Sequence, residues 1–536
     1  MRSLFLILLS FVLFARCTRV QEKEKPNILL IMVDDMGYSD LGCYGGEVQT
    51  PNIDKLASQG IRFTQMHNSA RCCPTRAALL TGHHPQQAGI NGMGVNLNMN
   101  AATIAEVLKE NGYHTGMTGK WHLSQTKPVD DPNEQLRWMA HKVDYGPFSP
   151  VENYPCNRGF QEHYGVIWGV VNYFDPFRLV HNEKPIKEVP DDFYMTDFIS
   201  EKSIDLIDEY SKDDNPFFLY VAHTAPHWPL HALPEDIDKY KETFKVGWEE
   251  IRKQRYERMI KMGLIDRETY PLPENSSGRS WDECVEKDYE AACMAVHAAM
   301  IDHVDQGVGQ IIQKLKETGQ YENTLILLLS DNGASYERGY PPGFDRPGFT
   351  RDSTMIEYNS PNLGAETTWN YLGRAWASAS NTPFRYWKME SYEGGSATPF
   401  IVHWPKGLAG KENTINRGLA HVIDIMPTCL ELSGATYPEM VNGEKTLPPS
   451  GISLMPFLTG ETTSIHDTLC WEHQRGKAVR IGDWKMSALP DKDWELFRIT
   501  EDYTETNDLA AQFPGKVAEM DKAWREWAVK VGIEFK

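Results

Sequence analysis

The chain has 536 residues, more than a single hydrophobic core usually covers, so we expect one large domain and a smaller one. Hydrophobic residues make up 41% of the sequence and include 15 tryptophans, enough to form such cores. The formal net charge of -20, from 54 basic and 74 acidic residues, argues against a nucleic-acid-binding protein, which would show a basic surface. A local group of basic residues can still bind a small anion on an acidic protein.

The first residues are typical of a targeting segment. Arg2 supplies a positive charge, and Leu4 to Phe14 form an apolar run shorter than the roughly 20 residues that span a bilayer. We therefore predict a signal peptide over residues 1–19 and export to the periplasm or the extracellular space. A lipid anchor on Cys17 is the alternative, which we do not favour because Arg16 stands where such sites require a small residue. We expect no transmembrane helix in the rest of the chain.

Four short apolar runs end abruptly in charged or polar residues. Helical patterns separate them, and this alternation is typical of buried parallel strands joined by crossover helices. The runs are Asn27 to Val33, Tyr113 to Gly119, Pro216 to Ala222 and Thr324 to Leu329. Ligands of open α/β sheets bind beyond the carboxyl ends of the strands, so the polar residues that follow these runs point to a single cleft.

Helical patterns and two excursions complete the large domain, which we predict over residues 24–432. The clearest helices cover Ala102 to Glu110 and Ala292 to Glu317. Residues 233–288 form a highly charged insertion with a helical pattern. Residues 333–381 are rich in glycine, proline and aromatic side chains, as expected of a long functional loop at the rim of a site.

The smaller domain is predicted over residues 433–536, where the pattern changes to shorter segments. Strand-like pieces occur around Val479 and Trp494, and a closing helix covers about Ala518 to Val531. The nine cysteines show no paired C-x-x-C spacing, so neither a zinc ribbon nor a dense disulfide scaffold is indicated. Export would permit one or two disulfides, whose pairing does not follow from the sequence.

The most specific local signal is the segment CCPTR, from Cys72 to Arg76, followed by the helical run AALL and by Thr81-Gly82. Pro74 suits a first helical turn, which places Cys72 at a helix N-terminus, where the dipole and free N–H groups stabilise an anion. A lone cysteine in this setting is more often a buried structural residue. The whole string, however, resembles the signature of type I sulfatases, C-x-P-S/T-R followed by L-T-G, whose first cysteine is oxidised to formylglycine.

The resemblance extends over nearly the whole mature chain and includes two metal motifs. Residues 26–37 resemble the first strand of the family with its paired aspartates, and the segment SDNG after the fourth run resembles the second motif. Alone, each motif would more often be a helix cap or a turn. Four hard oxygen ligands suit Ca²⁺ or Mg²⁺ and suit Zn²⁺ poorly. By similarity the ion is Ca²⁺, with Mg²⁺ second, and its ligands are Asp34, Asp35, Asp331, Asn332 and the modified residue at Cys72.

The segment GKWHL resembles the G-K-W-H-L-G motif of the family, with Ser124 in place of the last glycine. Lys120 and His122 are two residues apart on an extended segment, so their side chains point to the same side. The resemblance makes Lys120 a sulfate-binding residue next to Arg76 and the nucleophile. It makes His122 a catalytic residue.

Two further motifs supply the remaining substrate-binding residues. The segment APHWPL matches the A-P-H-x-P motif of the family and contributes His227. Lys388 lies before the segment EGG and Pro399, a spacing that resembles the last sulfate-binding lysine of the family. We interpret the neighbouring histidines as structural or surface residues: His83, His84, His223 and His231.

The resemblance implies an alkaline-phosphatase-like α/β fold, with a three-layer domain around a central, mostly parallel sheet and a smaller C-terminal α+β domain. Within the family, the chain is most similar to the large bacterial arylsulfatases. These share the charged insertion after His227 and the long loop before Lys388.

The implied reaction is the hydrolysis of a sulfate ester. One hydroxyl of hydrated formylglycine attacks sulfur in line, with Asp331 as the candidate base. The metal, Lys120 and Lys388 neutralise the sulfate oxygens, and His227 or Lys388 protonates the leaving alcohol. His122 then removes the proton of the second hydroxyl, which releases sulfate.

The implied partners are a sulfate-ester substrate and the enzyme that modifies residue 72, either a formylglycine-generating enzyme or a sulfatase-maturating enzyme. Aryl sulfates would serve in assays and sulfated carbohydrates in nature. The nearest alternative is a phosphodiesterase or phosphonate monoester hydrolase on the same fold. A second alternative is a catalytically silent carbohydrate-binding protein. Lys120, His122, His227 and Lys388 together favour sulfate as the substrate group. The intact Cys72 and Arg76 argue against a catalytically silent protein.

Overall fold

The computed structural model describes residues 24–534, and in it the four apolar runs form neighbouring parallel strands. β1 (Asn27–Val33) lies between β7 (Phe217–Ala222) and β8 (Thr324–Ser330), and β3 (His114–Lys120) pairs with β7. All four predicted strands are thereby confirmed, with ends that shift by at most one residue. Because the four strands run in the same direction, their carboxyl ends meet at one edge of the sheet.

The described residues form a central sheet of 11 strands, in the order β12-β2-β11-β8-β1-β7-β3-β4-β5-β6, with β13 beside β2. Most neighbouring pairs are parallel. β11 is antiparallel to both of its neighbours, and the edge strands β5 and β6 are also antiparallel. The strands not yet given are β2 (Ile61–His67), β4 (Glu162–Val166), β5 (Leu179–His181), β6 (Lys184–Pro185), β11 (Ala397–His403), β12 (Thr414–Asn416) and β13 (Ala420–His421).

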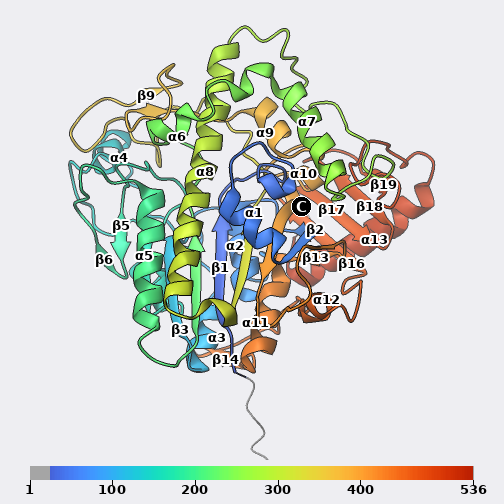
Figure 1. The fold of residues 1–536 in the computed structure, drawn as a ribbon, viewed down its shortest axis with the longest axis horizontal. Helices are drawn as coiled ribbons and strands as arrows, with labels where there is room; N and C mark the ends of the chain where they lie inside the picture. Colours follow the sequence, from blue (N-terminus) through green and yellow to red (C-terminus); the bar gives the residue numbers. More distant parts are fainter. Residues whose placement is uncertain (1–23, 535–536) are drawn as a thin grey trace, which may run out of the picture.

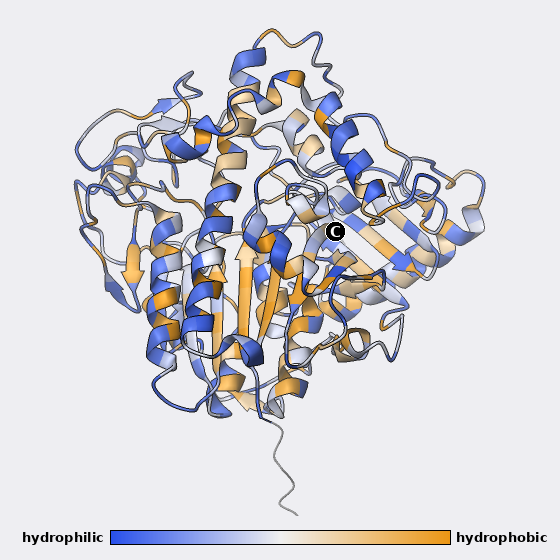
Figure 2. Cartoon of the chain, in the orientation of Figure 1, coloured by the Kyte–Doolittle hydropathy of each residue, from blue (hydrophilic) through white to orange (hydrophobic). Residues whose placement is uncertain are grey.

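Helices cover both faces of the sheet, which gives three layers (Figure 1). Alternate side chains of β1 belong to two separate cores. Leu29, Ile31 and Val33 pack in one with α1, α5 and α8, and Ile28, Leu30 and Met32 pack in the other with α2, α3 and α11. Burial on both faces explains why these strands are continuous apolar runs (Figure 2). The covering helices are α1 (Pro51–Ser58), α5 (Met195–Tyr210), α8 (Lys287–Glu317), α2 (Cys72–Thr81), α3 (Ile104–Glu110) and α11 (Ile425–Ser433).

The two clearest predicted helices are confirmed as α3 and α8. α3 begins after Thr103, which forms a capping box with Glu106. α8 begins at Lys287, five residues before the predicted start, because its acidic first turn is helical as well. The charged insertion contains α6 (Pro234–Asp238), a short 3-10 helix (Thr243–Val246) and α7 (Trp248–Lys261), and the long loop contains β9 (Glu357–Tyr358), β10 (Thr368–Trp369) and α9 (Arg374–Ser380).

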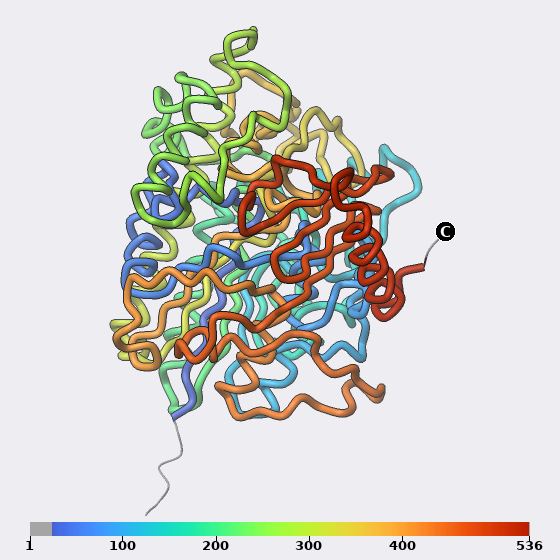
Figure 3. The backbone as a smooth tube through the Cα atoms, turned by 90° about the vertical axis from the view of Figure 1, so that its right-hand side faces the viewer, coloured from blue at the N-terminus to red at the C-terminus, as the bar shows by residue number. Residues whose placement is uncertain are grey.

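A four-stranded antiparallel sheet forms the C-terminal part of the chain, and Figure 3 shows it against one side of the large body. Its strands are β16 (Thr468–His473), β17 (Gly476–Ile481), β18 (Trp484–Ala488) and β19 (Glu495–Arg498), and α13 (Pro514–Val531) covers one face. Val479 and Met486 pack against α13. The predicted strand around Val479 is therefore present, and β19 begins one residue after Trp494. The short helix α12 (Met455–Thr459) instead packs in the core of the large body.

All eight described cysteines are free thiols, so the disulfides that export would permit do not occur within residues 24–534. The predicted signal peptide over residues 1–19, with Cys17, lies outside the described residues. Within them, the structure contains no helix of the length and hydropathy that a membrane crossing requires.

Candidate active site

The carboxyl ends of β1 and β8 bring the predicted acidic residues together. Asp34 and Asp35 follow β1, and Asp331 and Asn332 follow β8. The backbone N–H of Asp35 donates to Asp331 Oδ1 (3.2 Å), and the side-chain amide of Asn332 donates to Asp35 Oδ1 (2.6 Å). All four side chains are buried. Parallel pairing of two strands thus joins residues that are 297 positions apart in the sequence.

Two of the predicted basic residues form ion pairs with this acidic group. Lys120, the last residue of β3, donates from Nζ to Asp34 Oδ2 (2.5 Å). Lys388 donates from Nζ to Asp35 Oδ2 (2.9 Å), and His227 Nε2 lies 3.5 Å from the same oxygen. The three residues come from three separate segments, so the tertiary structure assembles the cationic side of the site.

Helix α2 places Cys72 and Arg76 at the same point. Cys72 is the first residue of the helix and is 1% exposed. Arg76 donates to Asp331 Oδ2 from Nε (3.0 Å) and Nη2 (2.8 Å), and from Nη1 to the carbonyl of Lys120 (2.9 Å). A hydrogen bond from the Cys73 thiol, with the charges of Lys120 and Lys388, holds the pKa of the Cys72 thiol well below its usual value although burial opposes this. The site therefore stabilises negative charge at residue 72.

His122 lies against the face of the site in an unusual backbone conformation. Its φ is 62°, a region that non-glycine residues seldom adopt and that often marks functional positions. Its ring meets Trp168 edge to face at 5.0 Å, and a Cβ atom on Gly169 would lie 2.3 Å from that ring, so only glycine fits there. Neither ring nitrogen has a hydrogen-bond partner among the described residues. Burial lowers the pKa of His122 to about 4, which leaves the imidazole neutral.

The acidic group has the properties of a cation site. Asp34 Oδ1 and Asn332 Oδ1 are buried and have no hydrogen-bond partner within residues 24–534. Burial, together with Asp331, raises the pKa of Asp34, and burial also raises the pKa of Asp35. A divalent cation would satisfy the free oxygens and relieve the repulsion between the carboxylates. Donor atoms of Asp34, Asp35 and His227 all lie within 4.8 Å of one another, whereas Asp331 Oδ2 is bound to Arg76.

Two glycine-rich turns hold Lys388 in place. The N–H of Lys388 donates to the carbonyl of Ala334 (3.1 Å), and the N–H of Gly333 donates to the carbonyl of Gly395 (3.1 Å). A Cβ atom on Gly333 would lie 1.9 Å from the carbonyl oxygen of Gly394, so the two turns approach each other too closely for a side chain. The second predicted metal motif thereby packs directly against the EGG segment that follows Lys388.

Sequence reasoning missed Glu337, a fourth carboxylate at the site. Its Oε2 accepts hydrogen bonds from Trp228 Nε1 (2.7 Å) and Ser335 Oγ (2.9 Å) and lies 3.4 Å from Lys388 Nζ. Burial opposes ionisation, but Lys388 and His227 lower the pKa of Glu337 to about 2. The one signal in the sequence was that Glu337 lies six residues after Asp331. Because the loop has no helical or strand periodicity, the sequence does not predict where its side chains point.

An aromatic wall lies beside the site. Trp228 is the neighbour of His227 and contacts Tyr371 at 5.2 Å, and Trp168 contacts Phe344 at 5.7 Å. Tyr371 and Phe344 belong to the long loop over residues 333–381, which therefore packs against the catalytic segments. The buried members of the wall are Trp138, Phe148, Trp168, Val170, Trp228, Ile356, Trp369 and Tyr371.

The four neighbouring histidines lie outside this arrangement. His231 Nε2 lies 2.7 Å from the carbonyl of Thr368, and His83 Nε2 lies 2.9 Å from the carbonyl of Leu447. The structure also buries His223 completely, and Trp527 donates to the ring of His84 (3.3 Å). These contacts agree with the structural interpretation of the group.

Comparisons with known proteins agree with the geometry. The family model described as Sulfatase matches residues 26–435. An uncharacterized sulfatase of Schizosaccharomyces pombe is 31% identical over 96% of this chain and 95% of its own length. The arylsulfatase of Klebsiella aerogenes is 32% identical over 81% of this chain and 92% of its own length. The crystal structure of Ps i-CgsB in complex with k-i-k-neocarrahexaose is 27% identical, with a TM-score of 0.65 and coverage of 95% of this chain and 94% of that one.

The three-layer fold also occurs in a protein with a different name. The phosphonate monoester hydrolase SpPMH from Silicibacter pomeroyi is 18% identical, with a TM-score of 0.55 over 94% of this chain and 96% of its own. The fold by itself is therefore compatible with more than one reaction, and the side chains at the strand ends must decide between them.

Proposed function

The chain belongs to the sulfatase family, and from this premise we propose that it hydrolyses sulfate esters of carbohydrates through a formylglycine made from Cys72. The observation that carries the proposal is the position of Cys72. It is the buried first residue of α2, next to Lys120 and Arg76 and at the same strand ends as the acidic group. A hydrated aldehyde there would supply the hydroxyl that attacks sulfur.

The acidic residues at the strand ends would bind a divalent cation, Ca²⁺ in preference to Mg²⁺. Its ligands would be Asp34, Asp35, Asp331, Asn332 and the modified residue 72, and the two unpartnered oxygens of Asp34 and Asn332 are the observation that supports this set. When bound, the ion would polarise a sulfate oxygen and stabilise the charge of the attacking hydroxyl.

The other residues of the site bind the substrate and move protons. Lys120 and Lys388 are buried and would neutralise the sulfate oxygens, while Arg76 fixes Asp331, the candidate base. His227 Nδ1 lies 2.7 Å from the carbonyl of Trp228, which can only accept, so this nitrogen carries a proton and Nε2 faces the site. Lys388, or His227 once it carries a second proton on Nε2, would protonate the leaving alcohol.

His122 would act as the base that returns residue 72 to the aldehyde. Apart from the contact with Cys72, its ring nitrogens have no partner within the described part of the chain, so one can accept a proton from a hydroxyl on residue 72. Without the second hydroxyl of a hydrated aldehyde, an unmodified cysteine would offer no such proton. The free nitrogens of His122 thus support the modification as well as the reaction.

The charges of the site favour sulfate over phosphate. Arg76, Lys120 and Lys388 face four carboxylates once Glu337 is included, so a divalent cation would leave a surplus of one positive charge. A sulfate monoester carries one negative charge, and a phosphate monoester carries nearly two at neutral pH. Among the solved structures, Ps i-CgsB is in complex with k-i-k-neocarrahexaose, a carbohydrate. These features support a sulfated carbohydrate as the natural substrate.

The proposal includes the route by which the enzyme matures. Residues 1–19 would direct export to the periplasm or the extracellular space, and a formylglycine-generating or sulfatase-maturating enzyme would oxidise Cys72. Cys73 provides the control, because its hydrogen bond to Cys72 and its burial raise the pKa of its thiol well above the usual value. We expect no oxidation at this residue.

Mass spectrometry and kinetics test the proposal together. Protein produced with a maturation enzyme should carry an aldehyde at residue 72 and a thiol at residue 73. C73A should keep turnover of 4-nitrophenyl sulfate, and C72A should lose it. Fully active protein with only a thiol at residue 72 would contradict the mechanism. If kcat/KM for a nitrophenyl phosphodiester exceeds that for the sulfate, the alternative hydrolase is correct.

A further inference from the structure

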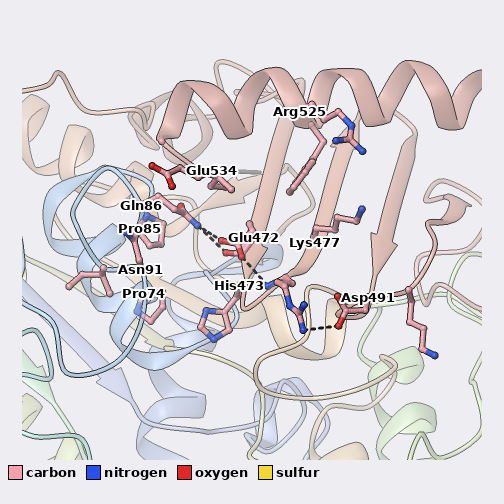
Figure 4. Close-up of a pocket in the computed structure, with 16 residues that line it drawn as sticks. Pro74, Pro85, Gln86, Asn91, Glu472, His473, Lys477, Asp491, Arg525 and Glu534 are labelled. Atoms are coloured by element: carbon pink, nitrogen blue, oxygen red, sulfur yellow. Dashed lines mark hydrogen bonds and ion pairs between the residues drawn. The ribbon is translucent and has the colours of Figure 1, made fainter. Parts of the chain in front are cut away.

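A large cavity lies beside the first turn of α2, between the large body and the C-terminal sheet (Figure 4). Its volume is about 1010 Å³, at the upper end of the range for small-molecule sites. Pro74 lies on one wall, and β16, β17 and the end of α13 form the other. The reaction proposed above uses none of the residues that line this cavity.

Short contacts link the cavity wall to residue 72. Arg71 directly precedes Cys72, and its Nη1 lies 3.4 Å from Nε2 of His473, which lines the cavity. Arg71 Nη2 also donates to Met93 Sδ (2.8 Å), two residues beyond the lining residue Asn91. A ligand group in the cavity would therefore lie next to the segment that carries the nucleophile.

Four basic side chains line the cavity, Arg475, Lys477, Lys492 and Arg525, against three carboxylates, Glu472, Asp491 and Glu534. Asp491 forms an ion pair with Arg475 (2.7 Å), and Glu472 accepts hydrogen bonds from Gln86 (2.9 Å) and from the backbone of Arg475 (3.1 Å). Lys477 and Lys492 also line the cavity, and neither forms an ion pair with any residue that the structure describes. These two ammonium groups can bind an anion in the cavity although the chain has a net charge of -20.

Lys477 lies over aromatic rings instead of a carboxylate. Its Nζ is 4.2 Å from the ring centroid of Trp494 and 5.4 Å from that of Trp524, which lines the cavity. Trp524 Nε1 donates to the carbonyl of Trp471 (3.0 Å), which fixes the orientation of its ring. A cation held against an indole face in a concave site suits a ligand that combines negative charge with a ring of C–H groups.

We propose that this cavity is a second anion subsite, which binds another sulfate group of a polysulfated carbohydrate while the sulfate ester to be cleaved lies at residue 72. This inference rests on the proposed function and narrows its substrate class. Lys477 and Lys492 bind the second sulfate, and Trp524 contacts the sugar that carries it. Burial lowers the pKa of Lys477, and an anion beside the ammonium offsets that cost.

Direct binding of a polysulfated disaccharide tests the subsite independently of catalysis. The probe is sucrose octasulfate, and its Kd is measured by titration calorimetry on the full-length mature enzyme. The K477Q/K492Q variant should raise this Kd roughly tenfold or more, because two charge-assisted contacts to the second sulfate are lost. The matched control is K516Q/K522Q, which removes the same charge from exposed positions of α13 outside the cavity. It should change the Kd by no more than about twofold, because exposed charges are screened.

Turnover of 4-nitrophenyl sulfate separates this inference from the proposed function. That substrate has no second anionic group, so K477Q/K492Q should leave its kcat/KM within about twofold of the wild type, at an unchanged Tm. An unchanged Kd for sucrose octasulfate, or an equal change in both variants, overturns the subsite while leaving the sulfatase reaction intact. Wild-type protein that binds the probe through the two lysines yet hydrolyses no sulfate ester overturns the reaction instead. Retention of tight binding in K477R would confirm that charge is the requirement.

Discussion

Two groups of charged residues are fully buried at opposite ends of one short segment. Lys388 belongs to the proposed reaction centre, and Glu393, five residues later, belongs to an ion network with His67, Lys485 and Glu505. In the network, Lys485 Nζ lies 2.6 Å from Glu393 Oε1 and 3.0 Å from Glu505 Oε1, and the N–H of Glu393 donates to Glu505 Oε2 (2.8 Å). Every charged atom of this network has a partner.

The reaction centre differs because several of its buried polar atoms have none. Asp34 Oδ1, Asn332 Oδ1 and both ring nitrogens of His122 lack hydrogen-bond partners within residues 24–534, whereas no side-chain atom of the ion network is in that state. An unpartnered buried polar atom costs about 1–3 kcal/mol. Burial and charge alone therefore do not identify a functional site in this protein. Unpartnered atoms distinguish the strand-end site from this network, because a metal ion, a substrate or a modified residue can satisfy them, but they also occur elsewhere, as at both ring nitrogens of the buried His223.

The largest effect should follow from D331A, which removes a proposed metal ligand and the partner of Arg76 together. We expect kcat/KM for 4-nitrophenyl sulfate to fall roughly 1000-fold or more, about 4 kcal/mol, because a preorganised charge and a ligand are lost at once. Metal analysis of the purified protein should show loss of the bound ion. The control is D352A, an exposed carboxylate of the rim. Full activity of the wild type after exhaustive chelation would contradict the metal site.

Next in size is K485M, which breaks the satisfied network. Its removal leaves Glu505 buried without a cation and Glu393 with His67 alone, so the free energy of unfolding should fall by about 3 kcal/mol or more in urea titrations. K516M removes a lysine from an exposed pair with Glu519 and should cost less than about 0.5 kcal/mol. If K485M and K516M lower the free energy of unfolding by the same small amount, the network does not stabilise the junction between the two sheets.

K388A tests the other end of the same segment. It should lower kcat for aryl sulfates roughly 100-fold or more, about 2.7 kcal/mol, because it removes a positive charge from a buried site. K388R should rescue poorly, since a planar guanidinium does not replace a compact ammonium. The measurement is steady-state kinetics on matched nitrophenyl sulfate and phosphate. Near-normal turnover by K388R would show that any cation suffices.

The smallest effect concerns a third satisfied cluster, His303 between two carboxylates. Its Nδ1 lies 2.6 Å from Asp236 and its Nε2 lies 2.7 Å from Asp197, and although burial opposes protonation these carboxylates raise the pKa of His303 to about 9. Because the pKa in the folded state exceeds the unfolded value of about 6.5, the stabilisation is complete below pH 6.5 and is lost as pH rises through 9. We expect a loss on the order of 1–2 kcal/mol.

Urea titrations at several pH values between 6 and 9.5 check this prediction. H303Q should show a lower stability at pH 6 and a flatter dependence on pH, because a neutral amide has no proton to lose. An equal slope in the wild type and in H303Q would assign the dependence to other groups.

The sequence predicted the central strands and the polar residues at their ends because those signals are local. Each apolar run that forms a central strand is buried on both faces, so its hydropathy alone located β1, β3, β7 and β8. Parallel strands expose their carboxyl ends at one edge, and the aspartates after β1 and β8 followed from that rule. The helix that begins at Cys72 was indicated by Pro74 and the alanines after it.

Contacts between distant segments could not be predicted in this way. No pattern in the sequence joins Glu337 to Lys388, because both lie in loops without periodicity. The same holds for Lys485, which is one of many lysines until β18 turns it towards Glu393. The cavity beside α2 depends on how the C-terminal sheet sits against the large body, and its residues come from parts of the chain about 400 positions apart.

By itself, then, the sequence determined the strands of the central sheet, the polar residues at their ends and the start of α2, because hydropathy, helix capping and strand direction act over a few residues. Only the tertiary structure decided which charges are paired and which are left free. That outcome depends on the desolvation of each atom and on the partners within reach, both of which are set by segments far apart in the chain. The unpartnered atoms at the strand ends and the lysines of the cavity are results of that packing.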